Sequence, residues 1–359
     1  MSFRAVTFSQ ESTYIQQFLH LPRRLYGPKE LMQKPEEELA ILTGTHVLSH
    51  YFTVVPLLVL DAKGTAVCRA VLTFYPDDPE AFLGFFESED LPEAAALLFQ
   101  KAEVLAKEHG CTHITGPVDA SFWIRYRLKV RQFEHTYTGE PSNKDYYFRL
   151  WRSAEYEVTA RYFSNHYIPA VAHQNRQFTA RLAEKRAQGY IIKSPSRASF
   201  DKTLQDVYGL LIELYRPFPA YRPITEAEFT ALYRYLKMLI RYPMVKMAYF
   251  QGQPVGFFIS IPDYGTMVYG RLSLPKLVQI FLTRLRPKSY VMLYMGVDTA
   301  HRGLGKALAE AIREELSRTG VPSVGALIRS GNINRDYFQE LVDYEFEYVL
   351  LGKKIQDSI

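Results

Sequence analysis

The chain has 359 residues, more than one ordinary hydrophobic core holds, and its 47% apolar and 23% charged residues are enough for two. Its net charge of +5 is mild for this length, so it suits an anionic ligand and does not indicate specific nucleic-acid binding. Cys68 and Cys111 are too few for a disulfide framework or a cysteine metal site. No apolar run approaches the ~18 residues of a transmembrane helix, and the first residues lack an apolar signal-peptide core, so we expect a soluble, cytoplasmic protein.

The first half predicts a run of strands interrupted by two helices. Strands are expected at residues 52–60, 66–74, 81–86, 112–115 and 156–163, and helices at 92–109 and 144–151. The turn before the first of these helices reads Glu87-Ser88-Glu89-Asp90-Leu91-Pro92. Its three carboxylates stabilise a helix start but repel a diphosphate. We therefore expect no phosphate ligand in this half.

The second half predicts a similar order of elements. Strands are expected at residues 189–193, 244–250, 254–260, 265–269, 290–297, 323–328 and 345–351, and helices at 200–215, 225–240, from 304, and at 334–342. Thr225 and Glu228 have the spacing of a capping box. The basic and apolar run 271–288 predicts an amphipathic helix over the domain junction, with binding to a membrane surface or an acidic partner as the alternative.

A short repeat links the two halves. Asn143-Lys144-Asp145-Tyr146 matches Asn334-Arg335-Asp336-Tyr337, about half a chain apart, and an acidic-Tyr-Glu step follows each. Duplication is the interpretation. We expect domains at residues 1–168 and 188–359, joined by a helical linker at 169–187.

The turn between the strand at 290–297 and the helix from residue 304 predicts an anion site. Arg302-Gly303-Leu304-Gly305-Lys306-Ala307 combines two glycines, which let a ligand approach the backbone, with two cations beside a helix start. A Walker A loop would need glycine at Ala300 and a hydroxyl residue at Ala307. A Rossmann turn would need a small residue at Leu308. Neither pattern fits.

The pattern Arg302, Gly305, Ala307 resembles motif A of the GNAT superfamily of N-acetyltransferases, in which this turn holds the pyrophosphate of acetyl-CoA. The resemblance implies an α/β fold with a mixed sheet, here two GNAT folds in tandem with a degenerate first copy. It also implies acetyl-CoA or another acyl-CoA as cofactor. The cofactor contacts would be Met295, Gly296 and Val297 beside the pantetheine, the turn residues Arg302, Gly303, Leu304, Gly305, Lys306 and Ala307, and Asn332. Over nearly the full length, the chain is similar to an uncharacterised bacterial family of tandem GNAT-like proteins.

The superfamily's usual acid is a tyrosine seven residues beyond an asparagine, but the seventh residue beyond Asn332 is Gln339. Tyr337, two residues earlier, is the candidate acid, although on a helix it is rotated by roughly 200°. Asp263, Tyr264 and Glu213 are open candidates for the base. The pairs His46 with His50 and His109 with His113 lack a third ligand, so we expect no metal site.

Three functions remain open on the sequence. The first is an acyl-CoA-dependent N-acyltransferase, with a small-molecule or peptide amine as acceptor and the first domain walling the acceptor site. The second is an aminoacyl-tRNA-dependent transferase of the Fem type, against which the intact turn and the mild charge count. The third is a non-catalytic CoA-binding or sensing module.

Overall fold

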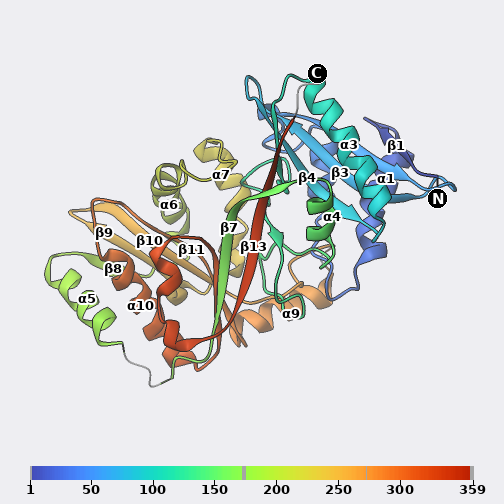
Figure 1. Ribbon diagram of the computed structural model, residues 1–359. Coiled ribbons are helices and arrows are strands. Elements are labelled where there is room, and N and C mark those ends of the chain that lie inside the picture. Colours follow the sequence, from blue (N-terminus) through green and yellow to red (C-terminus); the bar gives the residue numbers. More distant parts are fainter. Residues whose placement is uncertain (1, 172–174, 272, 356–359) are drawn as a thin grey trace.

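The computed structural model describes residues 2–171, 175–271 and 273–355 of the chain, and its strands form one mixed sheet of 13 strands (Figure 1). Along the sheet the order is β1-β2-β3-β4-β5-β13-β7-β12-β11-β10-β9-β8, with β6 paired to β13 at the side. The pairs β4–β5 and β11–β12 are parallel, and the other pairs are antiparallel. No helix within the described ranges is long and apolar enough to cross a membrane.

All the predicted elements of the first half are present in the expected order. The elements of this half are β1 (Arg4–Thr7), α1 (Ser12–Leu25), α2 (Pro35–Leu42), the short 3₁₀ helix η1 (Ser49–Tyr51), β2 (Thr53–Leu60), β3 (Ala66–Phe74), β4 (Glu80–Ser88), α3 (Pro92–Glu108), β5 (His113–Gly116), β6 (Leu128–Lys129), α4 (Tyr147–Ser153) and β7 (Glu157–Tyr167). Of these, β1, α1, α2, η1 and β6 were not predicted. Strands β3 and β4 are buried almost throughout because α1 covers one face of this part of the sheet and α3 the other.

The second half places helices on both faces of its strands. Its elements are α5 (Arg176–Ala187), β8 (Ile191–Lys193), α6 (Phe200–Leu214), α7 (Glu226–Tyr233), α8 (Leu236–Leu239), η2 (Tyr242–Met244), β9 (Val245–Phe250), β10 (Gln253–Pro262), α9 (Leu274–Leu285), β11 (Tyr290–Val297), α10 (Leu304–Thr319), β12 (Ser323–Arg329), η3 (Ile333–Asp336), η4 (Gln339–Leu341) and β13 (Val342–Lys354). Neighbouring β10 residues point to opposite faces, so Phe257 packs in the core that holds α6 and Phe258 in the core that holds α10.

Three predicted elements of the second half are wrong. Residues 265–269 form turns, not a strand, because Gly265 has a φ of 53° and the Met267 N–H bonds the Tyr264 carbonyl. The helix expected at 334–342 is two 3₁₀ turns separated by Phe338, whose φ of 54° is left-handed and cannot continue a helix. The helix at 225–240 is divided into α7 and α8, although its Thr225–Glu228 capping box is formed.

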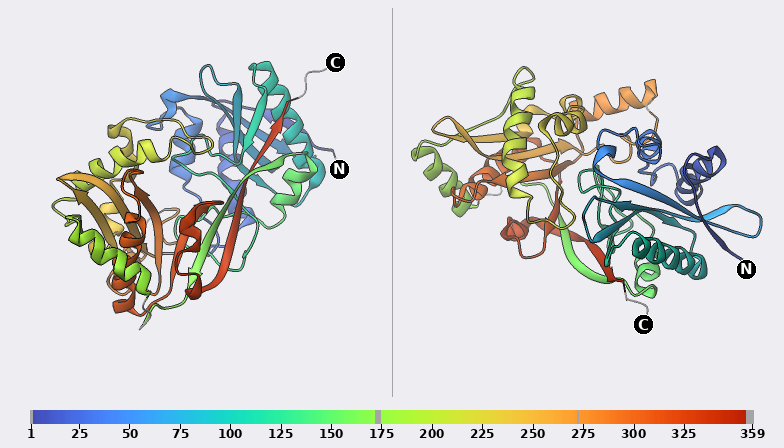
Figure 2. Two further views of the ribbon diagram at one scale, coloured as in Figure 1. Left: turned by 60° about the vertical axis from the view of Figure 1, so that its left-hand side comes forward. Right: turned by 90° about the horizontal axis from the view of Figure 1, so that it is seen from above.

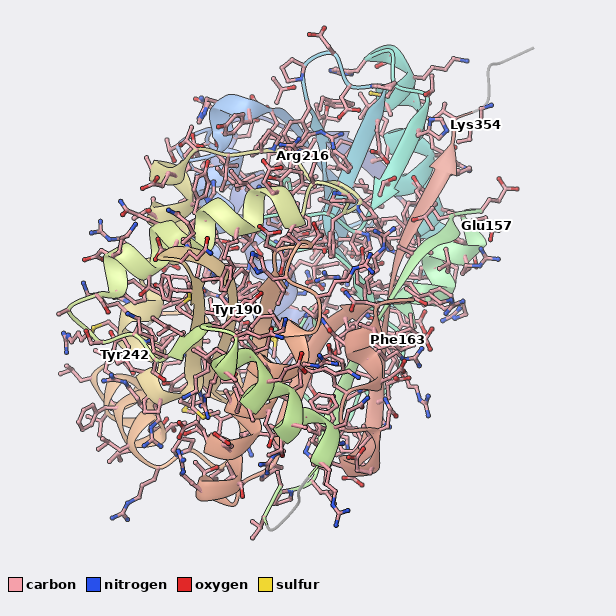
Figure 3. All side chains as sticks on the ribbon, turned by 90° about the vertical axis from the view of Figure 1, so that its left-hand side faces the viewer. Glu157, Phe163, Tyr190, Arg216, Tyr242 and Lys354 are labelled. Carbon is pink, nitrogen blue, oxygen red and sulfur yellow. The ribbon has the colours of Figure 1, made fainter. Side chains whose placement is uncertain are left out.

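The last strand of each half is exchanged. β13, the end of the second half, lies between β5 and β7 of the first half, and β7 pairs in turn with β12 (Figure 1). The β7–β13 pairing runs from Val342 opposite Tyr167 to Gly352 opposite Glu157. Figure 3 shows the outer ends of these two strands at Glu157 and Lys354. Each half therefore completes its part of the sheet with a strand from the other.

A buried polar network fixes this exchange. The Tyr137 hydroxyl bonds Ser164 Oγ on β7 at 2.9 Å and the Tyr348 hydroxyl on β13 at 3.0 Å. Tyr348 donates to Glu140 Oε1 at 2.5 Å, and Lys129 Nζ lies 2.7 Å from the same oxygen. Removing one partner would leave another buried group unsatisfied. The network therefore holds the strands in register.

The gap between β4 and β5 in the first half is filled by its own chain. These strands pair only from Glu80 to Phe82, and beyond that point the Val118 N–H bonds the Leu83 carbonyl at 3.0 Å. A Cβ built on Gly84 would lie 1.9 Å from the Val118 carbonyl oxygen. The half whose turn carries the three acids therefore has no open strand edge at this place.

Replacing Gly84 by alanine should cost about 3 kcal/mol or more of unfolding free energy, because the methyl group collides with backbone that cannot move independently. Gly209 is the matched control, since it lies in α6 with open space around it. Gly209→Ala should be neutral or stabilise by up to about 1 kcal/mol. Chemical denaturation of both variants measures this. Equal midpoints for Gly84→Ala and the parent would mean that the gap is not closed as described.

Candidate active site

Strands β11 and β12 separate part-way along their length and leave a strand edge without a partner. Their parallel pairing covers only Tyr290, Val291 and Met292, opposite Ser323, Val324 and Gly325. Beyond it, β11 keeps its pairing with β10 through Val297. Strand β12 pairs with β7 along its length, with a register shift after Gly325, and no longer pairs with β11. The backbone of β11 from Leu293 onward can therefore pair with a ligand on its open side.

Glycine at position 296 is required by the packing behind that edge. A Cβ there would lie 2.6 Å from the Phe257 ring and 2.7 Å from Leu214. The aromatic core under β10 and β11 thus presses directly on the backbone of the strand that borders the gap. Met295, Gly296 and Val297 all line the cavity that opens from it.

The turn after β11 presents a helix start that no side chain caps. Gly303 is the N-cap residue of α10, with a left-handed φ of 80° that favours glycine. The loop before it is fixed by the Asp298 carbonyl, which accepts from the His301 N–H at 2.9 Å, and by the Tyr190 hydroxyl, 2.8 Å from His301 Nδ1. The first N–H groups of α10 and its dipole favour an anion at this end.

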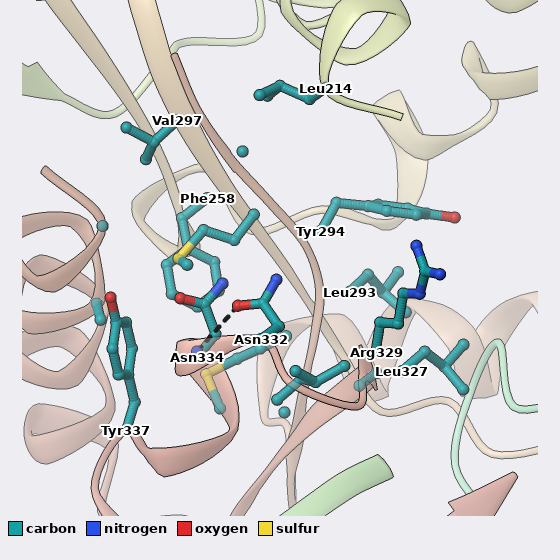
Figure 4. Close-up of a pocket in the computed structure, with 18 of the residues that line it drawn as sticks. Leu214, Phe258, Leu293, Tyr294, Val297, Leu327, Arg329, Asn332, Asn334 and Tyr337 are labelled. Atoms are coloured by element: carbon teal, nitrogen blue, oxygen red, sulfur yellow. Dashed lines mark hydrogen bonds between the residues drawn. The ribbon is translucent and has the colours of Figure 1, made fainter. Parts of the chain in front are cut away.

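One cavity of about 500 Å³ joins the strand edge to the helix start (Figure 4). Seven of the ten predicted cofactor contacts and the candidate acid line it, namely Met295, Gly296, Val297, Arg302, Gly303, Gly305, Asn332 and Tyr337. Leu304, Lys306 and Ala307 do not line it. Leu304 and Ala307 are fully buried and anchor the helix in the core, and the Lys306 ammonium lies over the Phe178 ring, 5.5 Å from its centre. The cavity is thus bordered by all three predicted β11 residues and by three of the six turn residues.

A cation that the sequence did not suggest stands at the turn. Arg181, on α5, packs against Gly303, where an added Cβ would lie 3.2 Å from Arg181 Cδ. Helix α5 is held on α10 by the Thr179 hydroxyl, which donates to Glu310 Oε1 at 2.7 Å. Arg302 is exposed beside the same turn. Two arginines therefore flank the start of α10, Arg302 from the turn itself and Arg181 from α5, where it also pairs with Glu184 at 2.7 Å.

Tyr337 reaches the site from a turn, so the helical rotation expected for it does not apply. A Cβ on Gly305 would lie 3.1 Å from the Tyr337 hydroxyl, and Figure 4 shows the ring standing beside α10. Its ring makes an edge contact with Phe178, with centroids 5.0 Å apart. Burial raises the pKa of Tyr337 above its ordinary value of 10.0, so the hydroxyl is protonated at neutral pH.

The amide side chain of Asn332 shapes the loop that carries Tyr337. Its Oδ1 accepts from the Asn334 N–H at 3.0 Å, the dashed contact in Figure 4, and caps η3. The side-chain nitrogen makes no hydrogen bond within the described part of the chain. Asn332 therefore has a structural role and a donor that is still available on the cavity wall.

None of the three candidate bases lies on the cavity wall. Asp263 Oδ1 accepts from the Thr138 N–H at 2.9 Å and from the Thr138 hydroxyl at 3.0 Å, across the junction of the halves. The buried Tyr264 donates to the Leu239 carbonyl, and the exposed Glu213 pairs with Arg216. Their positions favour structural roles. Among the described residues, no group of three His, Cys, Asp or Glu side chains could hold a metal ion.

The first half supplies the far wall of the cavity. Phe122, Tyr126 and Arg127 come from the segment that fills the β4–β5 gap, and they face Tyr215 on the second half. Phe122 and Tyr126 are stacked with centroids 4.8 Å apart, and Phe122 meets Tyr215 edge-on at 5.8 Å. The Arg127 guanidinium lies 3.7 Å from the Tyr126 ring centre. The 26 Tyr and 23 Phe of the chain are the sequence signal that could have indicated this wall.

Comparison with known proteins finds similar folds among solved structures. No family model and no curated protein sequence matches the chain. Among solved structures, a tandem GNAT protein from the clavulanic acid biosynthesis pathway superposes with a TM-score of 0.56 at 13% identity over 100% of both chains. A GCN5-related N-acetyltransferase from Sphaerobacter thermophilus gives 0.50 at 14% identity over 99% of this chain and 97% of that one. A probable N-acyltransferase from Enterococcus faecalis V583 gives 0.52 at 11% identity over 99% and 73%.

These likenesses confirm the expected fold class. Each half has one pair of parallel strands that pair only over three residues, and the second half has a glycine turn after the first strand of its pair. The chain has the tandem GNAT fold.

Reversing the charge of Arg302 should weaken CoA binding, because this exposed cation stands beside the uncapped start of α10. Arg302→Glu should raise the Kd for CoA by about tenfold or more, which corresponds to ~1.4 kcal/mol. Arg318→Glu is the matched control at the other end of the same helix and should change the Kd less than about twofold. Calorimetric titration with CoA measures both. Equal losses would mean that only overall charge attracts the ligand.

Proposed function

We propose that the protein is an acyl-CoA-dependent N-acyltransferase that moves an acyl group, with acetyl as the simplest case, to an amine. One observation carries this proposal: the open edge of β11 and the uncapped start of α10 face the same cavity. An unpaired strand edge suits the amides of pantetheine, and a helix start with two arginines suits a diphosphate. Neither feature alone would select this ligand.

The residues present fit that cofactor. Gly303 and Gly305 let Arg181 and the Tyr337 hydroxyl approach the turn closely, since Cβ atoms there would lie 3.2 Å from Arg181 Cδ and 3.1 Å from the hydroxyl. Arg302 and Arg181 would neutralise the phosphates, and Met295 to Val297 would pair with pantetheine. Bound acyl-CoA supplies the activated acyl group as a thioester. The N–H groups of β11 on the open side are the donors available to polarise its carbonyl.

The amine attacks directly in this scheme. A C–N bond forms as the C–S bond breaks, and an ammonium acceptor gives up two protons in total. The sulfur takes up one of them, and the other passes to water. The aromatic wall built by Phe122, Tyr126 and Tyr215 excludes water from the place where the acceptor must sit. Tyr337 is the candidate proton donor, since it is held protonated beside α10.

Two measurements on the full chain test the function. CoA should raise the melting temperature, and acetyl-CoA with a panel of amines should release free thiol. Binding of CoA without thiol release from any amine would favour the sensing module. Salt-sensitive retention of tRNA together with no response to CoA would favour the Fem-type transferase and overturn the proposal.

Tyr337→Phe tests the proton donor. If the hydroxyl protonates the departing sulfur, kcat should fall by about tenfold or more while KM for acyl-CoA changes less than about threefold. Tyr344→Phe is the control, because Tyr344 is a half-buried tyrosine stacked on His166 away from the cavity. An unchanged kcat in Tyr337→Phe would remove this residue from the chemistry.

The pH profile gives an independent check on the same residue. Because burial raises the pKa of Tyr337 above 10.0, its acid form persists to at least that pH. The parent should therefore show no fall of kcat below pH 10 that disappears in Tyr337→Phe. A descending limb near neutral pH that the substitution abolishes would contradict the burial-driven shift.

A further inference from the structure

A second, larger cavity lies beside the first. It has a volume of about 740 Å³ and is lined from the second half mainly by aliphatic side chains, including Leu236, Leu239, Ile261, Ile280 and Leu293. The exchanged sheet leaves this space between α7, α8 and α9 on one side and the first half on the other. Its size is in the range of small-molecule sites.

The two cavities meet along strand β11. Leu293, Tyr294 and Leu327 line both of them, and Met295 follows directly on the same strand. Figure 4 shows these three residues together on the side of the first cavity away from Tyr337. A molecule reacting beside Met295 can therefore extend past Tyr294 into the second cavity.

The charged side chains on the wall of the second cavity are already engaged. The contacts are the ion pairs Lys34–Glu37, Glu38–Arg69, Arg125–Asp119 and Lys129–Glu140, and a hydrogen bond from Arg284 Nε to the Ile240 carbonyl. A charged ligand would have to compete with one of these ion pairs for its counter-charge, except at Arg284, whose Nε bonds a neutral carbonyl. A hydrocarbon needs no partner and gains from the aliphatic wall.

Helix α9 covers the cavity incompletely. None of its residues is buried, although Ile280 and Phe281 line the cavity, and Phe281 is 54% exposed. The helix lies across the junction next to the first half (Figure 2). Helices normally bury their apolar stripe. An apolar guest in the cavity would cover the α9 side chains that line it, such as Ile280 and Phe281, and shield them from water.

We propose that the second cavity receives a long hydrocarbon chain carried by one of the two reactants, either the acyl group of the thioester or the tail of an amphiphilic amine. The inference rests on the proposed function and names its substrate class. Each methylene moved from water into such a cavity tightens binding by about fourfold at most. Chain length is therefore the property to which the site should respond.

Two substrate series with the full-length protein distinguish the sources. One compares acetyl-CoA with lauroyl-CoA at a fixed amine, and the other compares butylamine with dodecylamine at a fixed acyl-CoA, all below micelle-forming concentrations. Calorimetry gives the Kd of each probe, and thiol release gives kcat/KM. A gain of about tenfold or more with lauroyl-CoA assigns the chain to the donor, and the same gain with dodecylamine assigns it to the acceptor.

A pair of variants on one helix locates the effect. Ile280→Trp fills the second cavity from α9, whereas Val278→Trp places the same ring on a position that is 57% exposed and does not line it. Ile280→Trp should abolish the chain-length gain and leave CoA binding and acetyl transfer to a short amine intact. Val278→Trp should retain the gain. An unchanged Kd for CoA shows that each variant is folded.

No preference for the longer chain in either series of the parent protein would overturn the inference, whatever the variants do. So would a chain-length gain that survives in Ile280→Trp with CoA binding intact. Both results leave the proposed function standing, because they presuppose CoA binding and turnover. Failure of the parent to bind CoA would instead refute the proposed function.

Discussion

The pairing of β7 with β13 is the constraint on which the rest of the structure depends. These two strands join the first half to the second in a single sheet, and the buried contacts of Tyr137 with Ser164 and Tyr348 set their register. Ser164 Oγ also accepts the Leu327 N–H at 2.9 Å, at the point where β12 leaves β11. The network that joins the halves therefore also stabilises the divergence of β11 and β12 at the first cavity.

Strand exchange also explains how a half without a phosphate turn contributes to the site. Because β13 lies against β5, the segment from Phe122 to Arg127 is brought opposite β11. The same segment that closes the gap of the first half walls the gap of the second. The two halves thus contribute different parts of the cavity. The second half has the open edge of β11, and the first half supplies aromatic side chains.

Strand β11, the glycine turn and helix α10 could be predicted because their signals are local. The apolar run at β11, the glycines at 303 and 305, and the amphipathic face of α10 each depend on neighbours in sequence. The exchange could not be predicted, since a strand presents the same pattern of side chains to either partner. Arg181 was missed for a related reason: it lies on α5, which was read as a linker, and only packing brings it to Gly303.

The region around Tyr337 shows how one residue can defeat a periodicity argument. Asn334 to Val342 has a helical composition, but Phe338 adopts a left-handed backbone and packs against Phe178 at 4.4 Å. Tertiary packing thus overrides local propensity. The seven-residue spacing from Asn332 loses its meaning once the helix is gone, and the position of Tyr337 is set by its contact with Phe178 instead.

Because β13 lies between β5 and β7, the sheet of the first half can close only after β13 has been synthesised. Strands β5 and β7 are translated early, but β13, which lies between them in the sheet, is translated after all the other elements of the second half. Until it arrives, two unpaired edges and the aromatic wall stay exposed, and closing the sheet requires contacts between distant parts of the chain. The first half is therefore open to aggregation while β13 is still missing. A chain truncated before residue 342 would lack the strand that pairs with both β5 and β7.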